Sequence, residues 1–425
     1  MSSSSEMTRK ALLALSALRD TSQLIEEIKN KATTGTISEK LPAETPITAE
    51  GTRKRLEFLQ QKTNHQFHFL TGNSHFSDTT LLHGNIENYI GMTLVPTGII
   101  GPLKVLGTAA NGEFYIPLAT SEGTLLASYH RGSRACYMAG GITSLCLIEG
   151  VQRSPLFKFK NIGELGVFLI WILDKIEDFR QITRNTSRYA VLTDVKSNIE
   201  GNQLILTFDF QTGDAAGQNM VTICTEAICR YIESHAPIQP ECWFIEGNYS
   251  GDKKATAQSF RTVRGKKVTA EITLNAQVVK EVLKTTPAAM EQYWRSSTIG
   301  TIQSGSIGAQ GHYANGLAAL FIATGQDVAC VSEAAVGITR MELTPDGHLY
   351  AAVTLPNLIV GTVGGGTSLP TQRECLELMD CYGAGNARKF AELCGALVLA
   401  GELSIAAALA AGQFAQAHQK FGRKS

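Results

Sequence analysis

The hydrophobic pattern of the chain starts with an amphipathic segment. Between Arg9 and Lys31 apolar residues recur at helical spacing, which predicts one helix. The stretch from Gly35 to Thr52 contains Pro42 and Pro46 and is predicted to be a linker or an extended arm.

From Glu87 onward the sequence is richer in glycine and apolar residues. Short runs typical of strands, such as Tyr115–Leu118 and Val353–Leu355, alternate with helices of small residues such as Thr124–Met138. The long apolar run Cys394–Gly412 contains a glutamate and many alanine and glycine residues. It therefore suits a helix packed inside protein better than one that faces lipid.

The pattern changes again between about Leu156 and Glu246. The elements predicted there are a helix Ile162–Phe179, strands Arg188–Leu192 and Leu204–Phe210, and a helix Met220–His235. This order indicates a small α+β domain inserted into a larger one.

Composition and charge narrow the class of protein. The 38 Lys and Arg residues balance 38 Asp and Glu residues, so no global positive field indicates a nucleic acid or an anionic membrane as partner. The nine cysteines include no CxxC pair, and no His/Cys group has zinc spacing, so reduced thiols and no metal are expected. The N-terminus lacks a secretory signal, and the apolar run Val167–Leu173 is far shorter than the ~20 residues of a membrane span. We therefore expect a soluble, cytoplasmic protein.

The loop Gly247–Lys254 carries the most concentrated chemistry. It places the carboxylate of Asp252 beside the ammonium groups of Lys253 and Lys254, behind a run of small residues. An unpaired charge is costly to bury, so this triplet is either a solvated turn or is placed where a reaction needs it.

Two glycine-containing turns are candidate ligand sites. The turn Gly213–Asn219 opens a predicted helix, where free N–H groups favour an anion, although an ordinary turn has the same pattern. It is not the GxGxxG fingerprint of a Rossmann domain. The run Gly361–Thr367 contains three consecutive glycines, which implies close approach either by a ligand or by a packed helix.

Other charged positions are ambiguous when taken singly. Glu122 starts an apolar helix, where the helix dipole alone favours a carboxylate. Arg131 and Arg134 lie three residues apart, which suits either phosphate binding or a solvated helix face. Asp327 follows an apolar helix, and His418 lies near the C-terminus, where a histidine ordinarily has no role.

Seven segments together form a recognisable set. In chain order they are Glu-Asn-Tyr-Ile-Gly (87–91), Ala-Thr-Ser-Glu-Gly (119–123), Gly-Asp-Ala-Ala-Gly-Gln-Asn (213–219), Gly-Asn-Tyr-Ser-Gly-Asp-Lys-Lys (247–254), Gly-Gln-Asp (325–327), Gly-Thr-Val-Gly-Gly-Gly-Thr (361–367) and Ala-Gly-Glu-Leu-Ser (400–404). This set resembles 3-hydroxy-3-methylglutaryl-CoA (HMG-CoA) reductase, specifically its catalytic portion without a membrane anchor. The resemblance runs from about Glu87 to Arg423.

The resemblance implies a reaction and a set of catalytic residues. The family reduces a thioester to an alcohol with two hydrides, through a hemithioacetal and an aldehyde. Glu122 matches the proton donor, and Lys253 matches the lysine that stabilises the developing oxyanion. Asp327 matches the aspartate that holds this lysine, and His418 matches the histidine that protonates the departing CoA thiolate.

The resemblance also implies the cofactor NADPH and the fold. The fold is α+β, in which a large mixed helical and sheet substrate domain carries an inserted, small, ferredoxin-like cofactor domain. The implied division is an N-terminal arm (1–85), the large domain (86–155 and 247–405), the small domain (156–246) and a C-terminal flap (406–425). The residues expected at the cofactor are Ser187, Arg188, Asp214, Gly217, Gln218, Asn219, Gly364, Gly365, Gly366 and Arg423.

CoA and the acyl group are expected to bind a second set of residues. That set is Ser128, Arg131, Arg134, Arg153, Glu246, Asn248, Asp252, Lys254, Lys284, Arg295 and Asn315. Glu87–Gly91 matches the strand through which two subunits pair in the family, so a homodimer or a higher even oligomer with shared active sites is expected.

The acyl-binding positions depart from the family pattern in two places. Glu246 stands where the family has a serine, and Ser296 or Ser297 stands where it has a lysine that pairs with the carboxylate of HMG. Arg295 is a candidate substitute for that lysine, and Glu246 is expected to pair with Arg153. The alternatives are therefore an HMG-CoA reductase with a rearranged acyl pocket, a paralogue that reduces another acyl thioester on CoA or a carrier protein, and a silent binding homologue. The presence of all four catalytic residues argues against the last of these.

Overall fold

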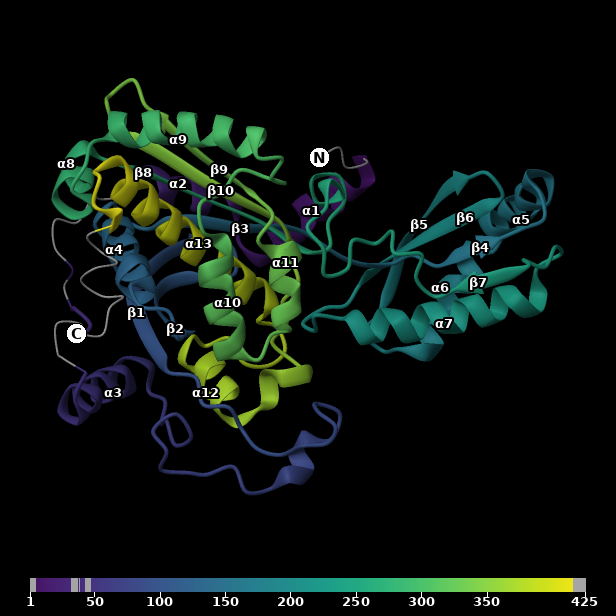
Figure 1. Cartoon of the computed structure of the whole chain (residues 1–425), viewed down its shortest axis with the longest axis horizontal. Helices are drawn as coiled ribbons and strands as arrows, with labels where there is room; N and C mark the ends of the chain where they lie inside the picture. The colour runs from purple at the N-terminus through teal and green to yellow at the C-terminus, as the bar shows by residue number, and fades with distance from the viewer. Residues whose placement is uncertain (1–4, 32–36, 38, 43–46, 416–425) are drawn as a thin grey trace.

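The computed structural model describes residues 5–31, 37, 39–42 and 47–415 (Figure 1). Three helices lie near the N-terminus: α1 (Ser5–Leu18), α2 (Thr21–Lys29) and α3 (Ala49–Thr63). The prediction of one helix was wrong, because the Asp20 side chain accepts a hydrogen bond from the Ser22 N–H and caps a separate α2. The end of the predicted linker, from Ala49 onward, lies in α3.

The large unit is built on a mixed sheet. Its strands are β1 (Thr97–Gly107), β2 (Asn111–Ala119), β3 (Ile142–Arg153), β8 (Gly265–Leu274), β9 (Ile338–Leu343) and β10 (Leu349–Leu358). The order across the sheet is β2-β1-β3-β8-β10-β9, and only the β1–β3 pair is parallel among these.

Helices surround this sheet, and α13 (Ala387–Ala410) runs through the middle of the unit (Figure 1). By length and composition alone α13 is able to cross a membrane, but 83% of its apolar window is buried inside the protein, as expected for a core helix. The other helical segments are η1 (Thr79–Leu82), α4 (Leu125–Met138), η2 (Ala257–Phe260), α8 (Ala276–Val278), η3 (Val279–Leu283), α9 (Pro287–Gln303), α10 (Tyr313–Thr324), η4 (Val328–Cys330), α11 (Val331–Ala334), η5 (Gly365–Ser368) and α12 (Pro370–Leu378).

Small residues let α4 and α13 cross in near contact. A Cβ atom placed on Gly132 would lie 1.8 Å from the carbonyl oxygen of Ala400, and one on Gly401 would lie 2.4 Å from the Tyr129 ring. Such distances are far below van der Waals contact, so only glycine fits at these positions. This crossing brings residues of α4 against the second half of α13.

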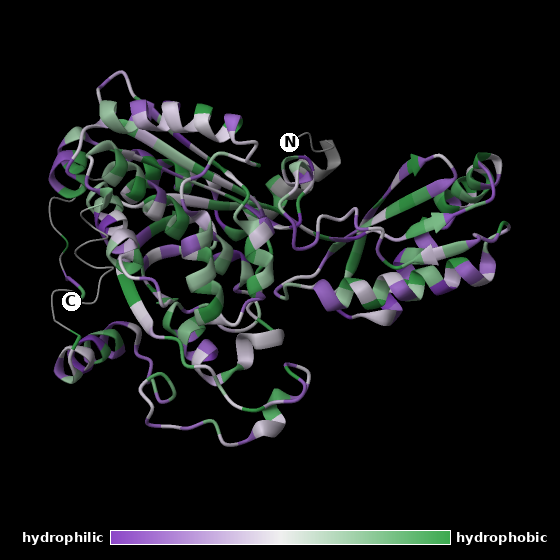
Figure 2. Ribbon diagram, viewed as in Figure 1, coloured by the Kyte–Doolittle hydropathy of each residue, from purple (hydrophilic) through white to green (hydrophobic). Residues whose placement is uncertain are grey.

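A second, smaller unit contains β4 (Leu156–Lys158), α5 (Ile162–Asp174), α6 (Ile176–Thr186), β5 (Val191–Glu200), β6 (Gln203–Gln211), α7 (Gln218–His235) and β7 (Cys242–Phe244). Its strands are antiparallel in the order β7-β4-β6-β5, and with α5 and α6 as one connection the chain order is β-α-β-β-α-β, the ferredoxin-like arrangement. Hydrophobic residues recur at helical spacing between hydrophilic ones along α7, and Val221, Cys224, Ile228 and Ile232 are buried, as expected for a helix with one buried face (Figure 2).

The α+β fold prediction is confirmed, with local corrections in the small unit. The predicted helix Ile162–Phe179 is two helices divided at Lys175, and the predicted strand at Arg188–Leu192 begins only at Val191 and continues to Glu200. The small unit has its own hydrophobic core, which includes Phe168 and Phe208. The domain boundaries themselves stay a prediction.

Candidate active site

The loop after β7 is held in an unusual backbone conformation. Asn248 and Lys253 have φ values of 59° and 55°, in the left-handed region that non-glycine residues rarely adopt. Such conformations persist only where surrounding contacts hold them. At Lys253 one such contact is its backbone N–H, which donates to Oε1 of Glu333 at 3.1 Å.

The side chain of Lys253 points to a second carboxylate. Its Nζ lies 2.8 Å from Oδ2 of Asp327, and the two side chains are 43% and 40% exposed. Asp327 begins η4 and accepts a hydrogen bond from the Ala329 N–H at 3.1 Å, which fixes the carboxylate. The hydrogen bond that Lys253 donates to Asp327 raises the pKa of Lys253, with partial burial opposing it. The structure thus joins two of the four predicted catalytic residues at an accessible site.

This pairing predicts a pH effect. Lys253 stabilises negative charge only while it is protonated, and a raised pKa extends the protonated range to higher pH. In Asp327→Asn the main cause of that rise is lost, so the alkaline decline of kcat should begin at lower pH than in the wild type. A pH–rate profile measures it, with exposed Asp346→Asn as the control. An unchanged alkaline limb in Asp327→Asn would contradict the assigned pair.

A buried arginine links the loop to the rest of the unit. Arg264 is fully buried, with Nε 2.8 Å from Oε2 of Glu333 and Nη2 paired with Oδ1 of Asp252. Oδ2 of Asp252 lies 3.1 Å from Nη1 of Arg153. Although burial acts to raise the pKa of Asp252, the attraction of Arg264 and Arg153 is stronger and holds that pKa below its ordinary value.

The side-chain carboxylate of Glu246 accepts hydrogen bonds from backbone N–H groups in and beside this loop. Its Oε2 lies 3.4 Å from Nη1 of Arg153, the pairing that was expected, and accepts the Ser154 N–H at 3.3 Å. Its Oε1 accepts the N–H groups of Tyr249 and Ser250 at 3.1 and 3.4 Å. The extra carboxylate is therefore paired with a cation, which it shares with Asp252, and bound to main-chain N–H groups, so it is not left without partners at the site.

Two members of this network were missed by the sequence analysis. Neither Arg264 nor Glu333 lies in a segment that carried the family resemblance. A signal was nevertheless present, because Glu333 is the only charged residue between Asp327 and Arg340. An isolated carboxylate in such a run is rarely buried unless it is paired.

The other two predicted catalytic residues are not joined to the pair. Glu122 is exposed before α4, and its own N–H donates to Oγ1 of Thr120 at 3.0 Å. Within the described part of this single chain it makes no hydrogen bond or ion pair with Lys253 or Asp327. His418 and the predicted cofactor residue Arg423 lie outside the described residues.

The turn Gly213–Asn219 packs against the start of α13. The Asp214 carboxylate accepts the N–H groups of Gly385 and Ala387 at 2.8 and 3.0 Å, so it caps that helix. Gly217 has φ of 83° and immediately precedes α7. Gln218 connects this turn to the network around Lys253. Its Nε2 contacts Sγ of Cys330 at 2.9 Å, and its Oε1 accepts a hydrogen bond from Arg264 at 3.4 Å. Asn219 is exposed.

The triple-glycine run has two kinds of surroundings. A Cβ on Gly361 would lie 2.5 Å from the Ala216 nitrogen, and one on Gly366 would lie 2.7 Å from the Gly325 oxygen, so tight packing explains these two glycines. Gly364 and Gly365 have φ values of 74° and 55° and open space around the missing side chain. Only the latter pair leaves room for a ligand near the backbone.

The other residues predicted to bind the cofactor, CoA or the acyl group lie in several separate parts of the structure. Ser187 Oγ accepts the Tyr189 and Ala190 N–H groups at 3.3 and 3.2 Å, and the side chain of Arg188 is exposed. Arg131 Nε and Ser128 Oγ each lie 3.0 Å from Oγ of Ser404, across the α4–α13 crossing. Arg134, Lys284 and Asn248 are exposed, Asn315 is half-buried at the start of α10, and Lys254 Nζ donates to the Asp252 carbonyl oxygen at 2.9 Å.

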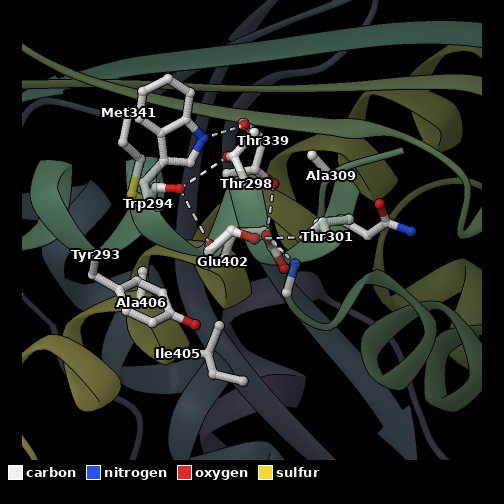
Figure 3. A pocket seen from close by; sticks show the side chains of 13 residues that line it. Tyr293, Trp294, Thr298, Thr301, Ala309, Thr339, Met341, Glu402, Ile405 and Ala406 are labelled. Carbon is white, nitrogen blue, oxygen red and sulfur yellow. Dashed lines mark hydrogen bonds between the residues drawn. The ribbon is translucent and has the colours of Figure 1, made fainter. Parts of the chain in front are cut away.

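A cavity of about 200 Å³ lies between α9, β9 and α13 (Figure 3). Glu402 faces it and is bound by the Gly311 N–H, the His312 N–H and the Thr339 hydroxyl at 2.8, 2.7 and 2.6 Å. Ser297 lines the cavity. Arg295 is two residues away, about 160° around the helix on the opposite face, where its largely exposed side chain pairs with Glu291.

These contacts define an enzyme centre in which a lysine, oriented by one carboxylate and held at its backbone by another, can stabilise charge on a substrate oxygen. The family model described as Hydroxymethylglutaryl-coenzyme A reductase matches residues 51–423. The chain belongs to this family.

Known members support that membership over most of the chain. The 3-hydroxy-3-methylglutaryl-coenzyme A reductase of Pyrococcus horikoshii is 42% identical over 379 residues, covering 88% of this chain and 91% of that protein. The corresponding protein of Aeropyrum pernix is 42% identical over 407 residues, covering 94% and 96%. The class II reductase of Streptococcus pneumoniae, solved bound to NADPH in open conformations, superposes with a TM-score of 0.69 at 20% identity, covering 88% of this chain and 100% of that one. The last likeness concerns the fold alone.

Proposed function

We propose that this chain reduces HMG-CoA to mevalonate and free CoA, with NADPH supplying two hydrides and the medium two protons. The observation that carries the proposal is the 2.8 Å pair of Lys253 and Asp327 on an accessible loop of a chain in this family. Lys253 stabilises the negative charge that develops on the carbonyl oxygen, and Asp327 keeps it oriented and protonated. Glu122 supplies the proton to that oxygen, and His418 protonates the thiolate that leaves.

The residues around the small unit suit NADPH. The exposed guanidinium of Arg188 matches a 2′-phosphate, the start of α7 at Gly217 presents free N–H groups, and Gly364 and Gly365 leave space beside the backbone. Asn219 is exposed at the same end of α7. Asp214 and Ser187 hold the neighbouring main chain by accepting backbone N–H groups. Gln218, the first residue of α7, accepts a hydrogen bond from Arg264.

Exposed apolar residues support a paired assembly with shared active sites. Glu87–Gly91 forms no strand in the single chain, and Ile90 and Leu94 are almost fully exposed. Exposed apolar side chains on a segment of this kind are suited to contact with another subunit. A second subunit is also the natural source of a Glu122 that reaches Lys253. The location we propose is the cytoplasm.

A second candidate is the same two-hydride reduction of a thioester that lacks the distal carboxylate. The arrangement on α9 favours it, because Ser297 lines the cavity while Arg295 pairs with Glu291 on the outer face. Arg153 remains as a cation for the HMG carboxylate, although Asp252 and Glu246 already share it.

One assay separates the two candidates. Purified protein is given NADPH with HMG-CoA or with an uncharged acyl-CoA of similar size, and NADPH loss and alcohol product are followed. We expect mevalonate, with kcat/KM for HMG-CoA at least ~10-fold above that for the uncharged thioester, the scale of one charged contact. Turnover of the uncharged substrate only would establish the second candidate. No NADPH oxidation with either thioester would overturn both.

A further inference from the structure

Glu333 lies at the junction of two structural supports of the catalytic loop. It is fully buried in α11, and each carboxylate oxygen faces a different partner. Oε1 accepts the backbone N–H of Lys253 at 3.1 Å, and Oε2 lies 2.8 Å from Nε of Arg264. A buried carboxylate is costly unless it is paired, so this position depends on the ion pair at Oε2 as well as on the hydrogen bond at Oε1.

The contact at Lys253 constrains the part of the loop that determines where the ammonium group points. A non-glycine residue with φ of 55° costs roughly 1–2 kcal/mol relative to ordinary backbone, so the loop would relax without external support. Glu333 holds the main chain of Lys253, and Asp327, six residues earlier in the same segment, holds its Nζ. One segment therefore fixes the lysine at both ends.

Arg264 extends this support to the residue before Lys253. Its guanidinium pairs with Glu333 on one side and with Asp252 on the other. Asp252 and Lys253 thus have their positions set from the same buried cation. Loss of the Glu333 charge would leave Arg264 with one carboxylate fewer and the Lys253 N–H with a weaker acceptor.

We propose that Glu333 is a positioning residue for the reduction: its carboxylate, held by Arg264, fixes the backbone at Lys253 so that the ammonium group meets the reacting oxygen. The proposal rests on the function proposed above. Glu333 itself does not touch substrate, and it acts only through Lys253 and Arg264.

The test compares two substitutions at this position with a matched control. Glu333→Ala removes both contacts, whereas Glu333→Gln keeps an oxygen for the Lys253 N–H but loses the charge facing Arg264. Glu374→Gln is the control, because Glu374 is another buried carboxylate that accepts three backbone N–H groups, from His68, Phe69 and Leu70, at 2.7, 2.9 and 2.8 Å. It therefore reports the general effect of neutralising a buried acceptor.

We expect kcat to fall by about 100-fold in Glu333→Ala and about 10-fold in Glu333→Gln, the range typical of a misplaced catalytic group. KM for the thioester and for NADPH should stay within about threefold, because uniform binding is not removed. Glu374→Gln should change thermal stability and leave kcat within about twofold. Equal kcat in Glu333→Ala and the wild type, or equal losses of kcat in all three variants, would overturn the positioning role.

A pH profile gives a readout that a purely structural role would not change. Burial raises the pKa of Glu333 to about 7, with the attraction of Arg264 acting against it. The charged or titratable groups that face it are Arg264, Asp252, Lys253 and Cys330. Because its raised pKa lies near neutrality, the ionised form that pairs with Arg264 is lost as pH falls below about 7. The wild type should lose kcat over that range, and Glu333→Gln should not show this component; an identical acid limb in both proteins would contradict the proposal.

A readout without turnover keeps the two proposals separate. The rate at which acetic anhydride modifies Lys253, followed by peptide mass spectrometry, reports the environment of its ammonium group. We expect a changed rate in Glu333→Ala and no change in Glu374→Gln, whether or not the wild type reduces HMG-CoA. An inactive wild type with this altered reactivity would overturn the function alone, and an active wild type with unaltered reactivity would overturn the role of Glu333 alone.

Discussion

Replacing Lys253 by alanine is expected to lower kcat by about 10³-fold while CoA binding stays measurable. A charged donor aimed at a developing oxyanion typically contributes about 10²–10³ in kcat, and here the donor is the ammonium group of Lys253, held 2.8 Å from Asp327. The protein should stay folded, because the pair is roughly 40% exposed and surface pairs contribute only about 0–1 kcal/mol. Steady-state kinetics give kcat, and calorimetry gives the Kd for CoA.

Lys54→Ala provides the control for the loss of one lysine. Lys54 pairs with Glu50 on the exposed side of α3, at 2.7 Å. Its kinetics should match those of the wild type. A Lys253→Ala enzyme that keeps more than a tenth of wild-type kcat would show that another group stabilises the oxyanion, and the catalytic assignment would fail.

Replacing Gly132 by alanine is expected to destabilise the large unit strongly. The added Cβ would lie 1.8 Å from the Ala400 carbonyl oxygen and 3.1 Å from its Cα, and backbone atoms of a buried helix cannot move aside as a side chain can. Overpacking a core commonly costs about 1–3 kcal/mol, and this backbone clash places the cost at about 3 kcal/mol or more. A fall in Tm of roughly 5 °C or more should follow.

The same change should weaken CoA binding, since Ser128 and Arg131 meet Ser404 only across this crossing. Gly300→Ala is the matched control, because Gly300 lies inside α9 and a Cβ there would meet nothing within 4 Å. Alanine at that exposed helical position should be neutral or stabilise by up to about 1 kcal/mol. A Gly132→Ala protein with wild-type Tm would mean that α4 and α13 can separate freely.

Local pattern predicted the elements better than their ends. The helix predicted at Thr124–Met138 begins one residue later, at Leu125, and that predicted at Met220–His235 begins two residues earlier, at Gln218. The breaks at Asp20 and Lys175 were missed, because apolar periodicity continues across each of them. A cap bond such as that from Ser22 to Asp20 involves one side chain and leaves little trace in a periodic pattern.

The site was predictable only where chemistry lies in a short segment. The Asp252–Lys254 triplet is visible in the sequence, and its resemblance to a known family suggested Asp327 as the partner of Lys253. Arg264 and Glu333 were not predicted, because the contact between Glu333 and Lys253 joins residues 80 positions apart, and such pairs appear only when the chain is folded. For Gly361–Thr367 the sequence left two alternatives, a ligand or a packed helix close to the backbone. The structure shows tight packing at Gly361 and Gly366 and open space at Gly364 and Gly365.

Strand β3 belongs to both sheets, and this constrains how the two units can move. Its residues Thr143–Gly150 pair with β8 in the large unit, and its last residues, Val151–Arg153, pair with β6 in the small one. A slip of one residue at either pairing would turn every side chain to the wrong face, so sliding is forbidden while bending is not. The shared strand therefore fixes the register of the small unit against the large one, so that any bend between the two units leaves the same residues of β3 paired with β8 and with β6.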